Sequence, residues 1–476
     1  MSESLEAALA GAPSLRAART ALEEEADRTW IVGGAVRDAL LGEAVADADL
    51  AVLPGREEPA ARAIARVAGG SAFALSEEHA TWRVISSMES WHLDVAALRA
   101  ETIEADLKAR DFTVNSIAIP LAGGDPIDPT GGRADCEGRI LRAVSDRSFG
   151  DDPIRLFRAP RLSARHSLSI DAGTVELARS EANRASEPAG ERQFAELRGI
   201  VAGPDPLRGL ELMAELGVTP VVLPELEELR GVVQNPNHHL DVLGHTLAVL
   251  EEWLGVERDV ADFAGELAPQ IEEFLAEPLA DELKRADALR FGAIFHDLGK
   301  PETRSEGGGY VTFIGHDEVG ARIIAGICRR LKTSRRLANH LEGLSLHHLR
   351  LGFLIHQRPL SRRAIYDYLA ATQPVSADVT LLSVADRLAA RGEGPIASPE
   401  MVEAHLDLAR EMLRDALVWH RDGAPRPPLS GDELASELGL SPGPAMGRVL
   451  EELRAAAFAG EIHDGEQALE RARELL

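Results

Sequence analysis

Short β-type runs occur only in the first third of this chain. They lie between residues 28 and 145, separated by helical stretches and by turns that contain glycine. After about residue 150, Ala, Leu, Glu and Arg recur at helical spacing, and aromatic residues make up only 4% of the sequence, as is common in packed helices. The pattern therefore predicts an α+β fold, with a mixed sheet in an amino-terminal head and an all-helical remainder.

The length of 476 residues exceeds what one hydrophobic core usually supports. We expect five segments: an amino-terminal extension (1–26), a head (27–146), a helical neck (147–229), a helical body (230–395) and a helical tail (396–476).

Charge and cysteine content narrow the functional class. The 51 basic and 78 acidic residues give a net charge of −27, which argues against a simple basic nucleic-acid coat. Two cysteines, Cys136 and Cys328, cannot build a disulfide framework and fit a reducing compartment. No apolar run reaches the roughly 18 uncharged residues that a membrane span needs. We expect a soluble, cytoplasmic protein without a membrane partner; the oligomeric state stays open.

The segment TWIVGGAVRDALLG predicts a strand, a tight turn at Gly33 and Gly34, and a helix. Glycines let backbone N–H groups approach a phosphate closely, and the helix amino end favours an anion. Arg37, one turn into the helix, could reach the same anion.

Acidic residues open two of the later β-type runs. Asp47 and Asp49 are two apart, so on a strand they point to one face and could hold Mg²⁺ through hard oxygen ligands. Asp94, in HLDVAAL, could complete the set. Two such ions can activate a hydroxyl and stabilise a pyrophosphate leaving group. A solvated strand end is the alternative interpretation of this short motif.

The order GGAVRD, DAD, KARDFTVNSIAI resembles the head of DNA polymerase β-like nucleotidyltransferases, and most closely the class II tRNA nucleotidyltransferase and bacterial poly(A) polymerase family. The resemblance implies that Arg110, Asp111 and Asn115 bind the triphosphate and sugar of the incoming nucleotide. The family's double arginine is Ala109-Arg110 here, so one cation is missing.

The run DDPIRLFRAPR resembles the family motif that reads the base. We expect Asp152 and Arg155, three apart on a helix, to face the same way. An acceptor beside a donor suits the pairing edge shared by C and A and rejects U and G. Arg158, Arg161 and Arg165 could contact phosphates or simply pair with nearby Glu and Asp. ERQFAEL resembles a further neck motif, which implies that Glu191 and Arg192 support the base-reading side chains.

A departure bears on which nucleotide is added. Only a short segment separates Arg99 from the KARDFT element, where family members that complete CCA carry a longer flexible segment. Within the family such a shortening is associated with enzymes that add only the two cytidines.

Four later positions resemble an HD-type phosphohydrolase domain. The resemblance implies that a divalent transition metal or Mg²⁺ is bound by His245, His296, Asp297 and Asp386. His316, His347 and His348 are further candidates that could touch a substrate phosphate. The cations Arg322, Arg329, Arg330, Lys332, Arg335 and Arg336 could face RNA or simply be solvated.

The resemblance implies template-independent transfer of CMP from CTP, with AMP from ATP left open, to the 3′ end of tRNA. A poly(A) polymerase and a metal-dependent phosphohydrolase with a nucleotide-binding head are the alternatives; a non-catalytic RNA scaffold ranks last.

Overall fold

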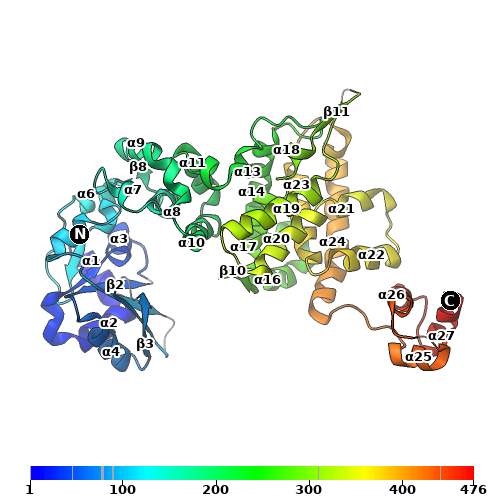
Figure 1. The fold of residues 1–476 in the computed structure, drawn as a ribbon, viewed down its shortest axis with the longest axis horizontal. Helices are drawn as coiled ribbons and strands as arrows, with labels where there is room; N and C mark the ends of the chain where they lie inside the picture. Colours follow the sequence, from blue (N-terminus) through cyan, green and yellow to red (C-terminus); the bar gives the residue numbers. More distant parts are fainter. Residues whose placement is uncertain (1, 46, 77–79, 88–90, 309, 440) are drawn as a thin grey trace. The chain divides into compact units, whose positions relative to one another are not determined.

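The computed structural model describes residues 2–45, 47–76, 80–87, 91–308, 310–439 and 441–476. The chain forms two compact units, Met1–Val222 and Leu223–Leu476 (Figure 1). The one sheet of more than two strands among the described residues lies in the first unit, and helices dominate elsewhere. This arrangement confirms the predicted α+β class.

Six strands form the sheet of the head in the order β3-β4-β5-β2-β1-β6. The β2–β5 pair is parallel and the other pairs are antiparallel. The strands are β1 (Thr29–Val32), β2 (Ala48–Val52), β3 (Ser71–Ser76), β4 (Thr81–Ile85), β5 (His92–Ala97) and β6 (Ala118–Pro120).

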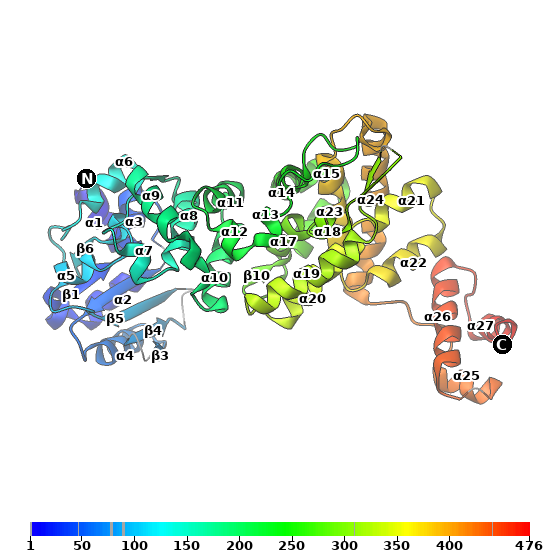
Figure 2. The same ribbon diagram turned by 45° about the horizontal axis from the view of Figure 1, so that its top comes forward.

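Helices cover the sheet unequally. On one face Val84, Leu93 and Val95 are fully buried, and α4 packs against β3, β4 and β5, as Figure 2 shows. On the other face a smaller cluster that includes Val32 and Leu107 packs beneath α5. The head helices are α3 (Gly34–Leu41), α4 (Glu57–Val67), α5 (Ile103–Lys108) and α6 (Gly132–Gly138).

The amino-terminal residues belong to the head. Helices α1 (Ser2–Gly11) and α2 (Pro13–Ala21) pack against α3 and α4, and they bury Leu9 and Leu15 almost completely. The sequence offered no motif here, but these apolar positions recur at helical spacing.

The neck is helical apart from β8 (Ser169–Ile170), which pairs with β7 (Ile140–Leu141) of the head. Helix α8 is amphipathic and packs between α10 and α11, so its buried face fixes the direction of its arginines. The neck helices are α7 (Ser148–Asp151), α8 (Arg155–His166), α9 (Ala172–Glu181), α10 (Gly190–Val201), α11 (Pro206–Glu215) and α12 (Thr219–Val222).

The second unit packs around α14, α17, α20 and α23, with Trp253 fully buried. Its elements up to α23 are α13 (Pro224–Glu227), α14 (Val242–Arg258), α15 (Val260–Ala264), α16 (Ala268–Ala276), β9 (Pro278–Ala280), β10 (Leu283–Lys284), α17 (Arg285–Phe295), α18 (Lys300–Thr303), β11 (Ser305–Gly307), β12 (Tyr310–Thr312), α19 (His316–Arg330), α20 (Arg335–His347), α21 (Arg350–Leu354), α22 (Arg362–Thr372) and α23 (Ser376–Ala389).

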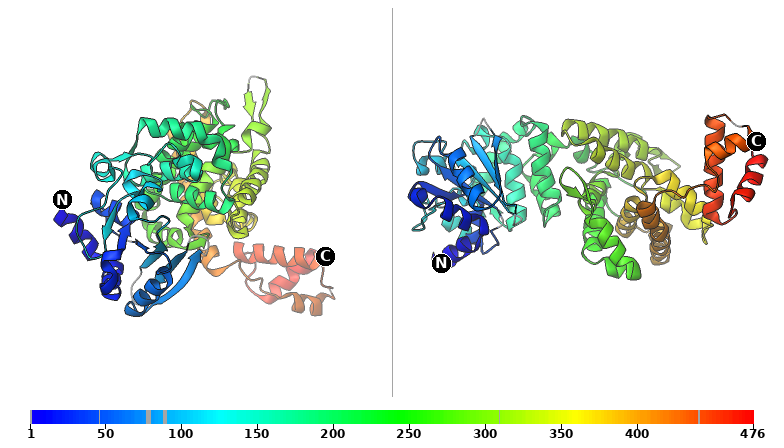
Figure 3. Two further views of the ribbon diagram at one scale, coloured as in Figure 1. Left: turned by 60° about the vertical axis from the view of Figure 1, so that its left-hand side comes forward. Right: turned by 90° about the horizontal axis from the view of Figure 1, so that it is seen from below.

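The long helix α24 (Pro399–Asp422) packs along α23, so the body extends well past residue 395. The last three helices, orange to red in Figure 3, build a small core of their own around Leu434 and Leu453. They are α25 (Gly431–Leu438), α26 (Pro444–Ala459) and α27 (Gly465–Glu474). None of the described helices combines the length and apolar character needed to span a bilayer.

Candidate active site and metal cluster

The head and helix α8 of the neck line a polar cavity of about 530 Å³. Most of the residues expected at a nucleotide site meet there. They are Gly33, Gly34, Arg37, Asp47, Asp49, Asp94, Arg110, Asp111, Asn115, Arg155, Arg158 and Arg161.

The acidic residues lie on adjoining strands. Asp49 of β2 is the register partner of Asp94 of β5, and Asp47 directly precedes β2. Loss of hydration in the cavity, followed by the charge of Asp94, raises the pKa of the Asp49 carboxyl. Asp94 accepts two hydrogen bonds of 2.8 Å from Arg83, and Asp47 lies 3.1 Å from His92 Nδ1. The two outer carboxylates thus have cationic or imidazole partners, and Asp49 is the one that a bound cation would most stabilise.

Gly33 holds the turn where a side chain would interfere. Its φ of +69° strains any L-residue, and a Cβ there would lie 3.3 Å from both Arg110 Nη1 and Asp49 Oδ2. Arg110 is held by Asp106, one helical turn earlier, at 3.1 Å. Gly33 therefore leaves room beside the turn for the Arg110 guanidinium and the Asp49 carboxylate.

A chain of polar contacts joins two cavity arginines. Arg37 donates to Asn115 Oδ1 at 2.8 Å, Asn115 donates to buried Asp111, and Arg158 Nη1 lies 3.1 Å from Asp111 Oδ2. Although burial raises the pKa of the Asp111 carboxyl, Arg158 and the hydrogen bonds from Asn115 and Phe112 lower it overall. Asp111 thus stays ionised and orients its neighbours.

The expectation that Asp152 and Arg155 share a helix face is wrong. Pro153 follows Asp152, and a residue before proline avoids helical angles; Asp152 is extended (φ −148°, ψ 102°) and lies between α7 and α8. Its carboxylate accepts a hydrogen bond of 2.8 Å from Arg192. The supporting role expected of Arg192 requires such a contact. Arg155 donates instead to the backbone carbonyls of Ala109, Arg110 and Ser148.

Sequence reasoning missed the residues that hold these groups in place. Glu196 of α10 lies 2.5 Å from Arg161 and 3.8 Å from Arg158. Asp106 could have been found from its spacing of four before Arg110 on a helix. Glu196, Arg83 and His92 carry no comparable signal, because only the tertiary fold brings them to the site.

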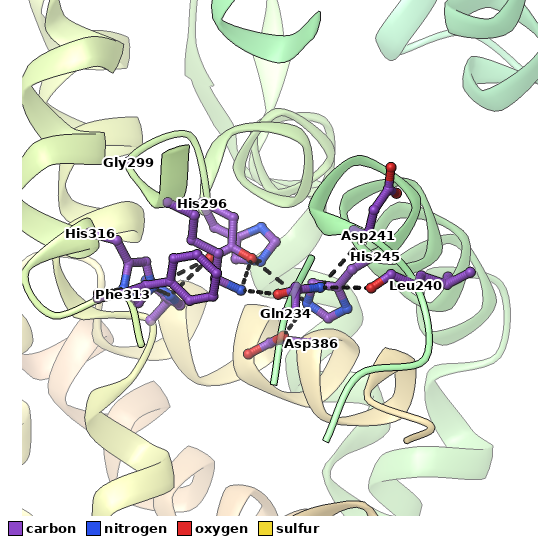
Figure 4. A network of polar contacts seen from close by, with 12 residues as sticks. Gln234, Leu240, Asp241, His245, His296, Gly299, Phe313, His316 and Asp386 are labelled. Carbon is purple, nitrogen blue, oxygen red and sulfur yellow. Dashed lines mark hydrogen bonds and ion pairs between the residues drawn. The ribbon is translucent and has the colours of Figure 1, made fainter. Parts of the chain in front are cut away.

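A cluster of buried histidines and aspartates occupies the second unit (Figure 4). His245 Nε2 lies 2.9 Å from Asp386 Oδ1 and 3.9 Å from Asp297 Oδ2, and His296 Nε2 lies 3.2 Å from Asp297 Oδ2. His245 comes from α14 and Asp386 from α23, and His296 and Asp297 directly follow α17. The structure thus brings together the four residues expected at the HD site.

A second trio adjoins the first. His316 and His348 approach each other at 3.1 Å between Nε2 atoms and lie 3.4 and 3.8 Å from Asp297 Oδ1. His347 is the neighbour of His348 on α20 and points elsewhere, with Arg350 at 3.0 Å. Successive helical residues are rotated by about 100°, so only one of the two could join the cluster.

The chemistry of the cluster fits a divalent metal ion. Each trio, His245 with His296 and Asp386 and Asp297 with His316 and His348, offers ligand atoms within 4.8 Å of one another. His296 Nε2 and both oxygens of buried Asp297 lack a well-aligned hydrogen bond. Nitrogen and oxygen donors in this combination suit a transition metal. Asp47, Asp49 and Asp94 are more widely spaced, because among the described residues these three do not form a group within that distance.

Six cations of α19, α20 and their connection are all exposed. Arg330 pairs with Glu225, whereas the other five make no ion pair within the described part of the chain. They are Arg322, Arg329, Lys332, Arg335 and Arg336.

The fold and these two sites define a nucleotidyltransferase with an attached HD domain. Residues 29–142 match the poly A polymerase head domain, residues 167–229 a probable RNA and SrmB-binding site of polymerase A, and residues 258–391 the HD domain.

Relatives extend this likeness over nearly the whole chain. The A-adding tRNA nucleotidyltransferase of Deinococcus radiodurans is 36% identical over 447 residues, 92% of this chain and 93% of that protein. The CC-adding tRNA nucleotidyltransferase of Thermus thermophilus is 32% identical over 92% of this chain and 91% of that protein. The chain belongs to the tRNA nucleotidyltransferase family, which confirms the resemblance found in its motifs.

Solved structures share the fold. A CCA-adding enzyme of Thermotoga maritima complexed with tRNA aligns with a TM-score of 0.60 at 21% identity, covering 99% of this chain and 98% of that one. Another CCA-adding enzyme structure aligns with a TM-score of 0.64, also at 21% identity, over 97% of this chain and 93% of that one.

Proposed function

We propose that the head transfers CMP from CTP to the 3′ end of tRNA without a nucleic-acid template and releases pyrophosphate. The observation that carries the proposal is the row of Asp49 and Asp94 facing the same cavity as Arg37, Arg110 and Arg158. Carboxylates and guanidinium groups are the two kinds of side chain that nucleotidyl transfer requires at one point.

The reaction balances as a single displacement. The terminal 3′ oxygen of the RNA forms a bond to the α-phosphorus, the bond from that phosphorus to the bridging oxygen of the β-phosphate breaks, and the hydroxyl proton passes to solvent or a carboxylate. Mg²⁺ held by Asp47 and Asp49, with Asp94 beside them, would supply activation of the hydroxyl and neutralise charge on the phosphates.

The chain's own cations hold the leaving group. Arg37, Arg110, Arg158 and Arg161 line the cavity, and each is already oriented by an acidic or amide partner. Charge-assisted hydrogen bonds from fixed guanidinium groups position a triphosphate without reorganising the protein.

Base selection falls to Asp152 and Arg155. Arg192 orients the Asp152 carboxylate as an acceptor, and the carbonyls of Ala109 and Arg110 fix Arg155 beside the phosphate-binding element. Asp152→Ala should therefore admit UTP and GTP at rates closer to that of CTP. Unchanged selectivity in primer extension with each of the four triphosphates would remove this assignment.

The identity of the added nucleotide is tested by product size. The short segment after Arg99 favours addition of two cytidines, while the similarity to an A-adding relative favours adenosine. We expect tRNA lacking its 3′ CCA to gain two nucleotides with CTP alone. Addition of one adenosine to tRNA ending in CC, with no use of CTP, would show that the transferred nucleotide is AMP and not CMP. A long adenosine run on any RNA would instead indicate a poly(A) polymerase.

A second activity is favoured by the buried cluster around Asp297. The trio of Asp297, His316 and His348, together with Asp386 of the other trio, lines a cavity of about 510 Å³. Lys300 and Arg387 line the same cavity. We propose metal-dependent hydrolysis of a phosphate ester there. Phosphate release should survive Asp47→Ala and be lost in Asp297→Ala, with the opposite pattern for CMP transfer. Loss of both activities in both variants would contradict two separate sites.

A further inference from the structure

The strand register that places Asp49 beside Asp94 continues across the sheet to its edge. Residues paired across neighbouring strands project from the same face. Asp49 pairs with Asp94, Asp94 with Arg83 of β4, and Arg83 with Phe73 of β3. One face of the sheet thus carries these four side chains in line, ending in an aromatic ring.

The edge of this face is apolar and open. Phe73 is 42% exposed, and so is Ile85, which lies two residues beyond Arg83 and therefore on the same face. Diagonal neighbours on adjacent strands are about 7–8 Å apart, within reach of an aromatic ring. The opposite face of the same strands is closed by α4, which buries Val84. An exposed aromatic and an exposed aliphatic side chain thus lie on the same sheet face as Asp49 and Asp94, toward the edge of the sheet.

The geometry of the transfer reaction puts the leaving pyrophosphate on one side of the carboxylates and the attacking hydroxyl on the other. The arginines that would hold the pyrophosphate end of the nucleotide, Arg110 and Arg158, lie on the side of β1 and α8. Attacking and leaving oxygens lie roughly in line in such transfers. The attacking hydroxyl must therefore approach from the side of β4 and β3, where Phe73 and Ile85 lie.

We propose that Phe73 and Ile85 form a platform for the unpaired 3′-terminal nucleotides of tRNA. The proposal rests on transfer at Asp47 and Asp49. Strands lie about 4.8 Å apart, so Phe73 is about 10 Å from Asp94, the length of about three stacked nucleotides at 3.4 Å each. Stacking on an aromatic ring is tolerant of sequence, which suits an end that changes as nucleotides are added.

The test separates tRNA positioning from chemistry. Phe73→Ala should raise the KM for tRNA about tenfold, within the range for loss of one base–aromatic stack, while kcat and the KM for CTP change less than twofold. Phe73→Trp should restore the KM, because any flat ring can stack. Ile85→Ala should raise the KM for tRNA by a smaller factor. Val67→Ala, which alters an equally exposed side chain at the end of α4, is the matched control and should change nothing.

Two results would overturn the platform. The first is a wild-type KM for tRNA in both Phe73→Ala and Ile85→Ala with CMP transfer intact, which leaves the proposed transfer standing. The second is failure of the wild-type protein to extend tRNA at all, which removes the proposed transfer and the platform together. A second readout needs no turnover: 2-aminopurine at the tRNA terminus should lose fluorescence on binding the wild-type protein and not on binding Phe73→Ala.

Discussion

Individual side chains in the head are arranged so that stability and function oppose each other at Asp49. Burial raises the pKa of the Asp49 carboxyl, and the charges of its neighbours Asp94 and Asp47 add to the rise. Each of those neighbours has a nitrogen partner, from Arg83 and from His92. Without a cation, an ionised Asp49 therefore destabilises the folded head.

Asp49→Asn should abolish transfer and raise thermal stability. The amide loses the metal-binding charge, and several kcal/mol of charge stabilisation corresponds to at least about a 10³-fold loss of rate. The same change removes repulsion with Asp94, so the thermal midpoint should rise when Mg²⁺ is absent. Labelled CMP incorporation and thermal unfolding check the two effects; a variant that transfers at the normal rate would refute the role of Asp49.

Gly33→Ala should weaken CTP binding and destabilise the head. The positive φ costs about 1–3 kcal/mol for a residue with a side chain, and the added Cβ crowds Arg110 and Asp49 at 3.3 Å. Isothermal titration with CTP and urea unfolding measure the two losses. Gly447→Ala, in a helix with open space around it, is the control and should be neutral or stabilising. Equal effects of the two substitutions would contradict the crowding argument.

Asp111 should make stability depend on pH. Its pKa is lowered in the folded state, so its contribution is fully present above the unfolded value of about 3.9 and is lost as the pH falls through the folded value. Asp111→Asn should cost about 1–3 kcal/mol at pH 7 and progressively less below pH 4. Urea unfolding of both proteins across this range tests the sign; a gap that widens at low pH would be inconsistent with it.

Helices and strands were largely predictable, but their ends were not. The strand, glycine turn and helix around Gly33 follow from local chemistry, as does the strand that begins beside Asp47. The break between α7 and α8 was signalled by Pro153, yet family spacing suggested one helix. His316 and His348 were candidates from the sequence, but only the packing of α19 against α20 brings their Nε2 atoms to 3.1 Å.

The exposed cations of α19 and α20 should bind tRNA phosphates. Changing Arg329, Arg335 and Arg336 to Gln should weaken tRNA binding and lower the slope of log affinity against log salt by about 1 for each phosphate that the variant no longer neutralises. The control is Arg421→Gln, since that exposed arginine pairs with Asp422. Filter binding at several salt concentrations decides the matter; an unchanged slope would exclude the surface as a binding site for tRNA.

At the scale of the whole molecule, each candidate site lies inside one compact unit. The nucleotide cavity is lined by residues up to Arg165, and the cavity beside the histidine–aspartate cluster is lined by residues from Asn235 to His405. Ligands of one site should therefore stabilise one unit directly. Sequence motifs predicted both candidate sites, whereas the boundary at Val222 depends on how the neck helices pack.

Calorimetry should show two unfolding transitions with separate ligand responses. A ligand at 100 times its Kd adds about 2.7 kcal/mol to the unit that binds it. CTP without metal should raise one transition, and Mn²⁺ should raise the other in wild type but not in Asp297→Asn. A single transition that both ligands shift would show that the two units unfold cooperatively.

Helix α8 carries consequences beyond packing. Arg155 begins the helix beside Asp152, for which we propose base selection, and Arg158 and Arg161 follow on the same helix, which contacts α10 and α11. A tilt of α8 that accommodates a different base must also move Arg158 and Arg161 relative to the phosphates. A mismatched nucleotide would then be held with its reactive phosphorus out of line, so errors would be suppressed through slow chemistry more than through weak binding.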